Sequence, residues 1–411
     1  MRICLITAHH VSFQPRILRE ADALSEAGHD VRVVCRQTDL LLTAYDHELM
    51  RSRRWKLQPI QLQRNGHSRS RWLIEATRAK ACEQLFDFGI RSERVAIGAY
   101  IRGLRAAVKI AGAEPADWFI AHTQAALPIA AAAASRWNAR LGFDCEDLLS
   151  ELGTDPPEIV RMIERRYLPA CDYVSVPSAG IAARLAGQYG LEPLVLYNVF
   201  PLELAREVPK PGDRVSAGPL RLHWFGQTIG EGRGLEEAVE AARDLGDQVE
   251  LHLRGRVTDA YRSHLESIAT NGLSIGMRDS QAGRPCHLFF HPLVNHEEVI
   301  RSMDQFDVGL SLERPDNPNY SLAATNKMFS YLLAGLAVVA TDTPGQQEIL
   351  GRIPSAGFLY EAGKPESLAK GVRRWCVDRA ALRQAQQAAW DAARSQFCWD
   401  LEKEKFVSLL N

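Results

Sequence analysis

The chain has 411 residues, of which 46% are hydrophobic and 24% are charged. This is the composition of an ordinary globular protein, and it excludes a disordered, collagen-like or disulfide-scaffold chain. The 49 Lys and Arg residues nearly balance the 50 Asp and Glu residues, for a formal net charge of -1. We therefore expect no nucleic-acid partner, and any site for an anion must be local.

No apolar run approaches the length of a transmembrane helix, and the N-terminal segment lacks the apolar core and cleavage site of a signal peptide. The eight cysteines are scattered and form no C-x-x-C pair. This spacing indicates a reducing cytoplasm and neither a disulfide framework nor a zinc site. His287, His291 and His296 lack a convincing ligand pattern, so we expect no metal there.

The first 200 residues alternate between apolar strands and helical segments. An apolar run at 3–7 precedes a helix that starts at Pro15 and stops at Gly28, and a second strand follows at 30–35. This is a βαβ unit, which implies a parallel sheet. Further strands are predicted at 118–121, 141–144, 173–176 and 194–197. The Pro- and Gly-rich stretch 201–219 is typical of a linker.

The same alternation restarts after the linker. Strands are predicted at 220–225, 249–253, 287–290, 308–311 and 337–340, with helices between them. We therefore predict an α/β fold of two doubly wound, Rossmann-like domains in tandem, with a cleft between them. Ligands of such sheets bind at the carboxyl ends of the strands.

A glycine-rich segment at 226–234 follows a predicted strand and precedes a helix at 235–244. Backbone N–H groups at a helix start attract phosphate, and glycines let a ligand approach the backbone closely. Arg233 adds a positive charge at this place. The alternative interpretation is a flexible loop with an exposed arginine.

A short helix is predicted from Asn326 to Gly335, leading into the strand at 337–340. Asn326, Lys327 and Ser330 fall on or near one face of it. A lysine in the first turn opposes the helix dipole unless an anion lies nearby, which hints at a role for Lys327. A solvated lysine is the alternative.

Four segments together resemble a known family. They are 14–21 with Gly28, 119–123 with 126–128, 143–148, and 326–342 with Pro344 and Glu348. In this order and spacing they are similar to the retaining glycosyltransferases of family 4, which have the GT-B architecture. The resemblance covers almost the whole chain.

The resemblance implies a nucleoside diphosphate-sugar as donor substrate, bound by a domain at 220–389, with no separate cofactor. The acceptor would lie in a domain at 1–200, completed by a C-terminal helical segment at 390–411. Arg233 and Lys327 would hold the diphosphate and stabilise its developing charge, so that no metal is required. In the retaining mechanism the acceptor hydroxyl attacks from the face that the phosphate leaves, and a phosphate oxygen can take its proton.

The resemblance also suggests the site residues. His122 matches the family histidine that contacts the transferred sugar, with capping of the neighbouring loop as its alternative role. His9 and His10 could instead be solvated loop residues without a substrate contact. Glu146 and Asp147 could instead be an acidic pair at a helix N-terminus. The catalytic set is His122, Arg233 and Lys327, and the substrate-binding set is His9, His10, Gln14, Glu146, Asp147, Gly226, Gln227, Asn326 and Ser330.

Three positions depart from the family pattern. Ser330 and Leu322 stand where the family usually has glutamates, and Gln227 stands where an arginine is common. They motivate one alternative function, a catalytically silent binding or partner protein with this fold. A nucleotide-sugar epimerase is the other. An active enzyme would serve the synthesis of a cell-surface glycan, a glycolipid or a natural-product glycoside.

The stretch from Arg51 to Lys80 is strongly basic and includes Trp55 and Trp72. Such segments suit an anionic membrane surface or a phosphorylated, lipid-linked acceptor. A solvated face is the alternative. We therefore expect a cytoplasmic protein, with peripheral contact at the inner face of the membrane as a further hypothesis.

Overall fold

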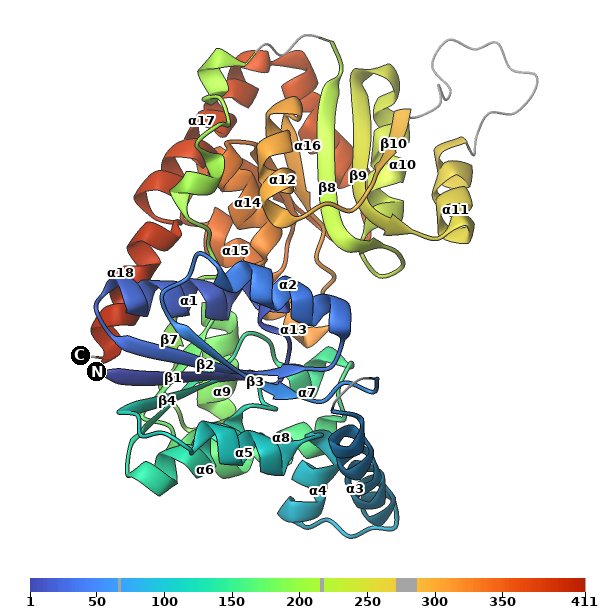
Figure 1. Cartoon of the computed structure of the whole chain (residues 1–411). Coiled ribbons are helices and arrows are strands. Elements are labelled where there is room, and N and C mark those ends of the chain that lie inside the picture. The colour runs from blue at the N-terminus through green and yellow to red at the C-terminus, as the bar shows by residue number, and fades with distance from the viewer. Residues whose placement is uncertain (66–67, 215–217, 271–286, 411) are drawn as a thin grey trace. The chain divides into compact units, whose positions relative to one another are not determined.

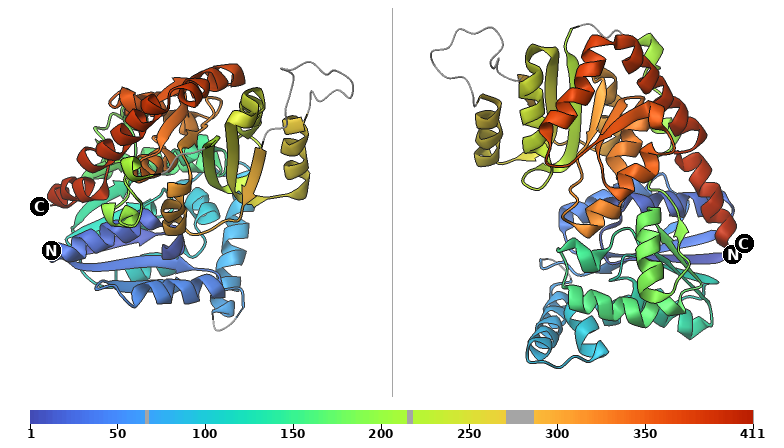
Figure 2. Two further views of the ribbon diagram at one scale, coloured as in Figure 1. Left: turned by 90° about the horizontal axis from the view of Figure 1, so that it is seen from above. Right: turned by 180° about the vertical axis from the view of Figure 1, so that it is seen from behind.

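The computed structural model describes residues 1–65, 68–214, 218–270 and 287–410. These residues form two compact units, one of 1–196 with 403–411 and one of 197–402. Each unit contains one parallel sheet with helices packed on it, so the predicted α/β class is confirmed (Figure 1). The chain reaches the first unit again through the end of its last helix, where the Trp118 indole donates to the Leu410 carbonyl at 3.3 Å. Figure 2 shows the two termini next to each other.

The first unit has seven strands in the order β3-β2-β1-β4-β5-β6-β7, all parallel. The sequence predicted all of them except β3, which contains Pro59 and three polar residues. Proline is tolerated there because β3 is an edge strand. The strands are β1 (Arg2–Thr7), β2 (Asp30–Gln37), β3 (Lys56–Gln61), β4 (Trp118–His122), β5 (Arg140–Asp144), β6 (Tyr173–Val176) and β7 (Leu194–Val195).

Helices cover both faces of this sheet, with α1 and α2 on one face and α5 and α6 on the other (Figure 1). The first helix starts at Pro15 and is followed by Gly28 with a φ of 86°, as predicted. The helices are α1 (Pro15–Glu26), α2 (Leu40–Met50), α3 (Arg69–Asp87), α4 (Glu93–Tyr100), α5 (Leu104–Ala111), α6 (Leu127–Trp137), α7 (Leu149–Leu152), α8 (Pro157–Tyr167) and α9 (Ala179–Tyr189).

The second unit has six strands in the order β10-β9-β8-β11-β12-β13, again all parallel. The sequence missed only the short edge strand β13. The strands are β8 (Leu220–Ile229), β9 (Val249–Val257), β10 (His287–His291), β11 (Val308–Ser311), β12 (Ala337–Thr341) and β13 (Gly357–Tyr360).

The helices of the second unit follow the predicted alternation. The linker segment carries only short 3-10 turns in its described part, at 202–205 and 211–213, while 215–217 lie outside the described residues. The helices are α10 (Leu235–Leu245), α11 (Asp259–Thr270), α12 (His296–Arg301), α13 (Pro318–Leu322), α14 (Asn326–Ala334), α15 (Pro344–Leu350), α16 (Pro365–Val377), α17 (Arg379–Ser395) and α18 (Trp399–Leu410).

One predicted boundary needs correction. The sequence analysis placed residues 390–411 with the first domain, but the chain changes unit at Lys403. The reason is the packing of α17, whose Trp390 is 7% exposed and lies beside Gly335 at the end of α14. Residues 390–402 therefore belong to the second unit.

A glycine in β11 tests the packing of the second sheet. A Cβ at Gly309 would lie 2.1 Å from the ring of Tyr331, which is fully buried. Gly309→Ala should lower the free energy of unfolding by about 1–3 kcal/mol, because the core must shift to accept it. Gly187→Ala is the matched control: it lies in α9 with open space around it and should raise the free energy by about 0.5–1 kcal/mol. Urea denaturation followed by circular dichroism measures both, and equal effects would contradict this packing.

Candidate functional site

The glycine-rich segment of the second unit is shorter than predicted. β8 continues through Gly226 and Gln227 to Ile229, with an irregularity in its pairing after Phe225. The two residues therefore lie in a strand and not in the predicted loop. The extension forms because Thr228 and Ile229 pair with the end of the long neighbour β9. Gln227 is exposed, whereas a Cβ at Gly226 would meet the Trp224 ring.

Arg233 stands between two glycines just before α10. Gly232 and Gly234 have φ values of 71° and 69°, a conformation that favours glycine. A Cβ at Gly234 would also lie 2.9 Å from the Leu312 carbonyl. The backbone on the C-terminal side of Arg233 thus packs against the segment that follows β11, whereas a Cβ at Gly232 would meet open space. The guanidinium itself is half-exposed and lies 5.4 Å from the centre of the Tyr320 ring.

Lys327 lies in the first turn of α14, which spans Asn326–Ala334 and ends on Gly335 as predicted. The Thr325 side chain caps this helix by accepting from the Lys327 N–H. The Lys327 ammonium lies 2.6 Å from Glu313, and the two side chains are 15% and 9% exposed. Glu313 is the anion that offsets the unfavourable helix dipole. We did not predict a role for Glu313 from the sequence, although this residue lies two positions after the end of the predicted strand at 308–311.

Arg233 and Lys327 thus contact the same stretch of chain, residues 312–320. Lys327 pairs with Glu313 at its start, and Arg233 packs on Tyr320 near its end. This stretch follows β11 at the carboxyl end of the sheet, where ligands of parallel α/β sheets bind. The structure therefore brings the two predicted cations to one edge of the second unit.

Ser330 does not lie where the sequence analysis placed it. Its side chain is fully buried, and its hydroxyl donates to the Asn326 carbonyl at 2.8 Å. The His296 Nε2 lies 3.3 Å from the same hydroxyl. Ser330 presents no surface to a nucleotide in this structure, because helix packing uses its one hydroxyl. Asn326 is exposed, and His296 is half-exposed.

In the first unit, Arg16 organises a buried group of charges at the carboxyl ends of the strands. Its Nε lies 2.6 Å from one Asp144 oxygen, and its Nη2 donates to the other at 2.8 Å. Arg16 also pairs with Glu20 at 3.4 Å and donates to the Leu196 carbonyl at 2.9 Å. The Ser175 hydroxyl donates to Asp144 as well. The contacts of Arg16 and Asp144 together join four segments of chain.

His122 belongs to the same group and is fully buried. Its Nε2 lies 3.0 Å from Glu20, and its Nδ1 lies 3.3 Å from Glu146 and 3.5 Å from Asp144. Burial disfavours the imidazolium, but the three carboxylates outweigh it and raise the pKa of His122 to about 10. His122 therefore faces carboxylates and offers a sugar no exposed atom. Glu146, with 18% of its side chain exposed, is the member of the group that reaches the surface.

The ligand atoms of Glu20, His122 and Asp144 lie within 4.8 Å of one another, a spacing that a metal ion could use. The chemistry does not fit, because the Arg16 guanidinium lies 2.6 Å from Asp144 and also pairs with Glu20. A divalent cation would face this fixed positive charge. We derive no metal chemistry from the group.

The adjacent histidines have separate roles. The His10 Nε2 accepts from the Thr38 N–H at 2.8 Å, and its Nδ1 therefore carries the proton that it donates to buried Asp46. His10 is buried and structural, contrary to the prediction of a substrate contact. His9 is exposed at the end of β1. Partial burial and nearby Arg36 lower the pKa of His9, while Glu146 opposes the shift.

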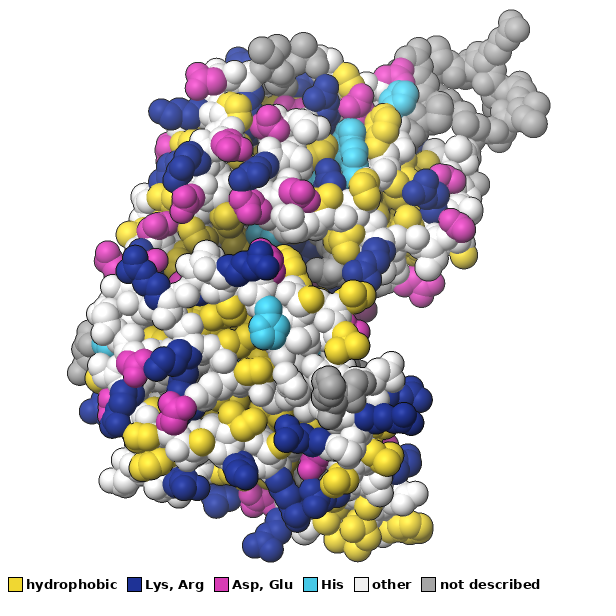
Figure 3. Space-filling view, in the orientation of Figure 1, with side chains coloured by type: hydrophobic (Ala, Val, Ile, Leu, Met, Phe, Trp, Pro, Cys, Tyr) yellow, Lys and Arg dark blue, Asp and Glu magenta, His cyan; other side chains and the backbone are white. Residues whose placement is uncertain are grey.

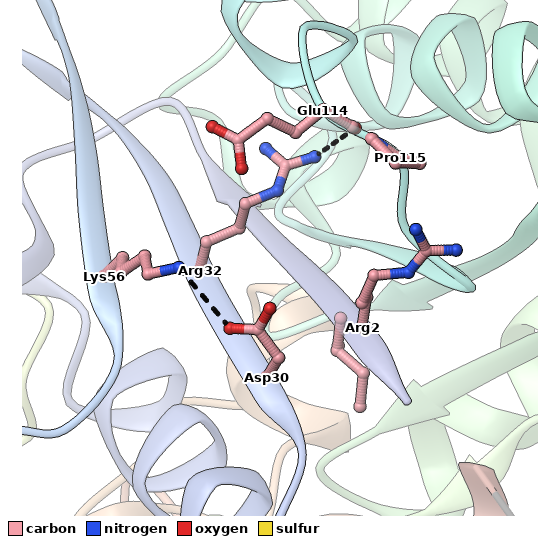
Figure 4. Close-up of a pocket in the computed structure, with 7 residues that line it drawn as sticks. Arg2, Asp30, Arg32, Lys56, Glu114 and Pro115 are labelled. Carbon is pink, nitrogen blue, oxygen red and sulfur yellow. Dashed lines mark hydrogen bonds and ion pairs between the residues drawn. The ribbon is translucent and has the colours of Figure 1, made fainter.

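The other predicted residues of this edge are less exposed than His9. Gln14 and Asp147 are half-buried, and the Asp147 carbonyl accepts from the Gln124 amide. A pocket of about 170 Å³ lies at the opposite, amino end of the sheet (Figure 4). Its charges are already satisfied: Lys56 lies near Asp30, and Arg32 donates to backbone carbonyls. We do not assign a function to that pocket.

The charge of His122 predicts a dependence of stability on pH. Its pKa of about 10 lies above the ordinary value of 6.5, so its contribution is complete below pH 6.5 and is lost as the pH rises through 10. Over this window the free energy of unfolding should fall by up to about 1.4 kcal/mol per pH unit. In His122→Gln this component should be absent, whereas exposed His47→Gln should retain it. Urea denaturation at a series of pH values measures the slope, and equal slopes in both variants would show that His122 is neutral when folded.

Comparisons with known proteins agree with this architecture. Residues 13–198 match the model of the glycosyl transferase 4-like domain. No curated protein matches the chain significantly.

Solved structures match the whole chain in fold. Sucrose-phosphate synthase from Thermosynechococcus elongatus is 16% identical, with 100% of this chain and 98% of that chain covered and a TM-score of 0.65. HepE of Anabaena, in complex with UDP and glucose, is 14% identical, with coverage of 100% and 99% and a TM-score of 0.66. A Listeria monocytogenes protein, provisionally described as a UDP-N-acetylglucosamine 2-epimerase, is 14% identical, with coverage of 100% and 95% and a TM-score of 0.57.

These identities are low, so the solved structures establish the fold. The predicted resemblance to the GT-B glycosyltransferases is confirmed: the chain has the GT-B fold throughout, and residues 13–198 match the glycosyl transferase 4-like domain.

Proposed function

We propose that the protein transfers a sugar from a nucleoside diphosphate-sugar to an acceptor hydroxyl, with retention of configuration. The observation that carries the proposal is the placement of Arg233 and Lys327 around residues 312–320, at the carboxyl end of the second sheet. The UDP bound in the HepE structure supports a nucleotide as the ligand of this fold. In this proposal the second unit binds the donor and the first unit binds the acceptor.

The two cations would hold the diphosphate. Lys327 has three N–H donors and uses one on Glu313, which leaves donors for phosphate oxygens. The guanidinium of Arg233 suits bidentate phosphate contacts. Both charges would stabilise the leaving diphosphate, and an oxygen of that group would accept the proton of the attacking hydroxyl. Metal independence is part of the proposal, because the two cations could themselves offset the charge of the leaving diphosphate.

In the first unit, His9 and Glu146 would contact the acceptor or the transferred sugar, since His9 is exposed and Glu146 is the member of the buried charged group that reaches the surface. His122 would act as a positioning residue, because its imidazolium contacts Glu146 at 3.3 Å and is itself buried. Because Ser330 is buried, it would not bind the ribose. Asn326 and half-exposed His296, which both lie beside Ser330, would contact the ribose instead.

We further propose that the enzyme works at a membrane surface, on a lipid-linked or polysaccharide acceptor. No helix of the described residues is long and apolar enough to cross a membrane. The support is α3, where exposed Leu73 and Ile74 lie among basic residues. Figure 3 shows basic and hydrophobic side chains together over the region of α3 and α4.

Nucleotide binding tests the donor site. Each charge-assisted phosphate contact is worth roughly 1.5–3 kcal/mol, so Arg233→Ala and Lys327→Ala should each weaken UDP binding by about tenfold or more. Lys370→Ala, which removes an exposed lysine of α16, is the matched control and should change nothing. Isothermal titration calorimetry measures the three variants. Unchanged affinity in the two site variants would exclude this donor site, and no UDP binding by the natural protein would favour a catalytically silent member of the fold.

Vesicle binding tests the membrane proposal. The protein should bind vesicles rich in anionic lipid, and binding should fall steeply with salt, since exposed charges are screened within about 10 Å at 0.1 M. The double variant Leu73→Gln and Ile74→Gln should bind less, whereas Val377→Gln, at a residue 83% exposed in the second unit, should not. Co-sedimentation measures this, and absent or salt-insensitive binding contradicts the proposal.

A further inference from the structure

A pocket of about 370 Å³ opens in the first unit beyond the end of β2. It is lined by Arg36, Thr38, Trp72, Tyr100 and Arg102, with two alanines, and no carboxylate is among its lining residues. The pocket is distinct from the fully buried group around Arg16 and belongs to none of the sites described above.

Two cations share this pocket without a counter-ion. The Arg36 Nη1 donates to the Arg102 carbonyl at 3.3 Å, and the buried Arg36 Nε has no partner. Within the described part of the chain, neither guanidinium forms an ion pair with a carboxylate. Burial, and after it the neighbouring Arg102, lowers the pKa of Arg36. An anion bound beside the two guanidinium groups would favour their charged forms.

An aromatic wall completes the pocket. The Arg102 guanidinium lies 5.9 Å from the centre of the Trp72 ring, and that of Arg64 lies 5.6 Å from it. The Tyr100 hydroxyl is directed to Asp155, to which it donates at 2.7 Å. Asp155 therefore satisfies Tyr100 and does not neutralise the arginines. Trp72 lies within cation–π distance of the Arg102 guanidinium and offers a flat apolar surface.

The pocket lies close to the proposed acceptor edge. The Arg36 N–H donates to the His9 carbonyl at 3.2 Å, and His9 lies within the electrostatic reach of both Arg36 and Glu146. Arg36 is the penultimate residue of β2, and His9 and Glu146 follow β1 and β5 at the same end of the sheet. A ligand with an anion at one end and a hydroxyl at the other could reach from Arg36 and Arg102 to His9 and Glu146.

We propose that this pocket is an anion subsite for the acceptor, and that Arg36 and Arg102 bind a phosphoryl group of the acceptor while Trp72 packs against it. The identification of the ligand as the acceptor rests on the proposed function, whereas the anion site itself rests on the geometry of the pocket. Paired planar guanidinium groups suit the oxygens of a phosphate ester. The phosphoryl group comes either from a soluble sugar phosphate or from a phospholipid-type carrier.

Binding of a hexose 6-phosphate, measured by calorimetry in saturating UDP, tests the soluble source, because UDP blocks the donor site. Arg36→Gln and Arg102→Gln should each weaken binding at least tenfold. Arg102 is exposed, so its variant should fold even if the Arg36 variant does not. Arg105→Gln, at an exposed arginine of α5, is the matched control and should stay within twofold of the natural protein.

Vesicles of phosphatidylcholine with roughly 20% phosphatidic acid test the lipid source with the same variants. Selective loss of either ligand in the Arg36 and Arg102 variants supports the subsite and identifies the source. Absence of binding to both ligands, or equal weakening by Arg105→Gln, overturns it. Phosphate-ester binding without UDP binding would reject the proposed function and keep the subsite, whereas the reverse result would reject only the subsite.

Discussion

The buried pairing of Arg16 with Asp144 is the interaction on which the first unit depends most. Both side chains are removed from water, so either partner alone would leave an uncompensated charge, at a cost of about 3–5 kcal/mol. The pair joins the first turns of α1 to the end of β5, and Ser175 and the Leu196 carbonyl extend it to β6 and to the chain beyond β7. It fixes the carboxyl ends of strands that are far apart in the sequence.

The proposed chemistry of this edge follows from that constraint. Because Arg16 holds Asp144 and Glu20 in place, His122 is surrounded by carboxylates and is charged at neutral pH. The imidazolium in turn holds Glu146, the one group of the set that reaches the surface. The fully buried charges thus act on a ligand through a single partly exposed carboxylate. Rigid support of this kind is what positions a substrate with little loss of entropy.

In the second unit, one segment of chain positions both cations. Within residues 312–320, Glu313 pairs with Lys327, and the Tyr320 ring packs against Arg233. Close contact with Gly234 keeps this segment against the start of α10. Both cations are therefore arranged before any nucleotide binds, and their placement depends on one short segment.

The sequence predicted what local patterns determine. Apolar runs located most of the strands, and Pro15, Gly28 and Gly335 located helix ends, because these signals act within a few residues. The edge strand β3 was missed because its polar residues and proline hide it, and β8 was cut short because pairing with β9 extends it. The burial of His10 and Ser330, and the roles of Glu20 and Glu313, depend on partners elsewhere in the chain. No local pattern shows such partners.

The central claim is that the protein joins a sugar from a nucleotide donor to the hydroxyl of an anionic acceptor. Proton NMR of the protein with UDP-sugars and sugar phosphates tests it most directly, because anomeric signals report both the new bond and its configuration. We expect a new glycoside with the anomeric configuration of the donor, formed only when both substrates are present. Conversion of the UDP-sugar to its epimer without an acceptor, or a glycoside of inverted configuration, would contradict it.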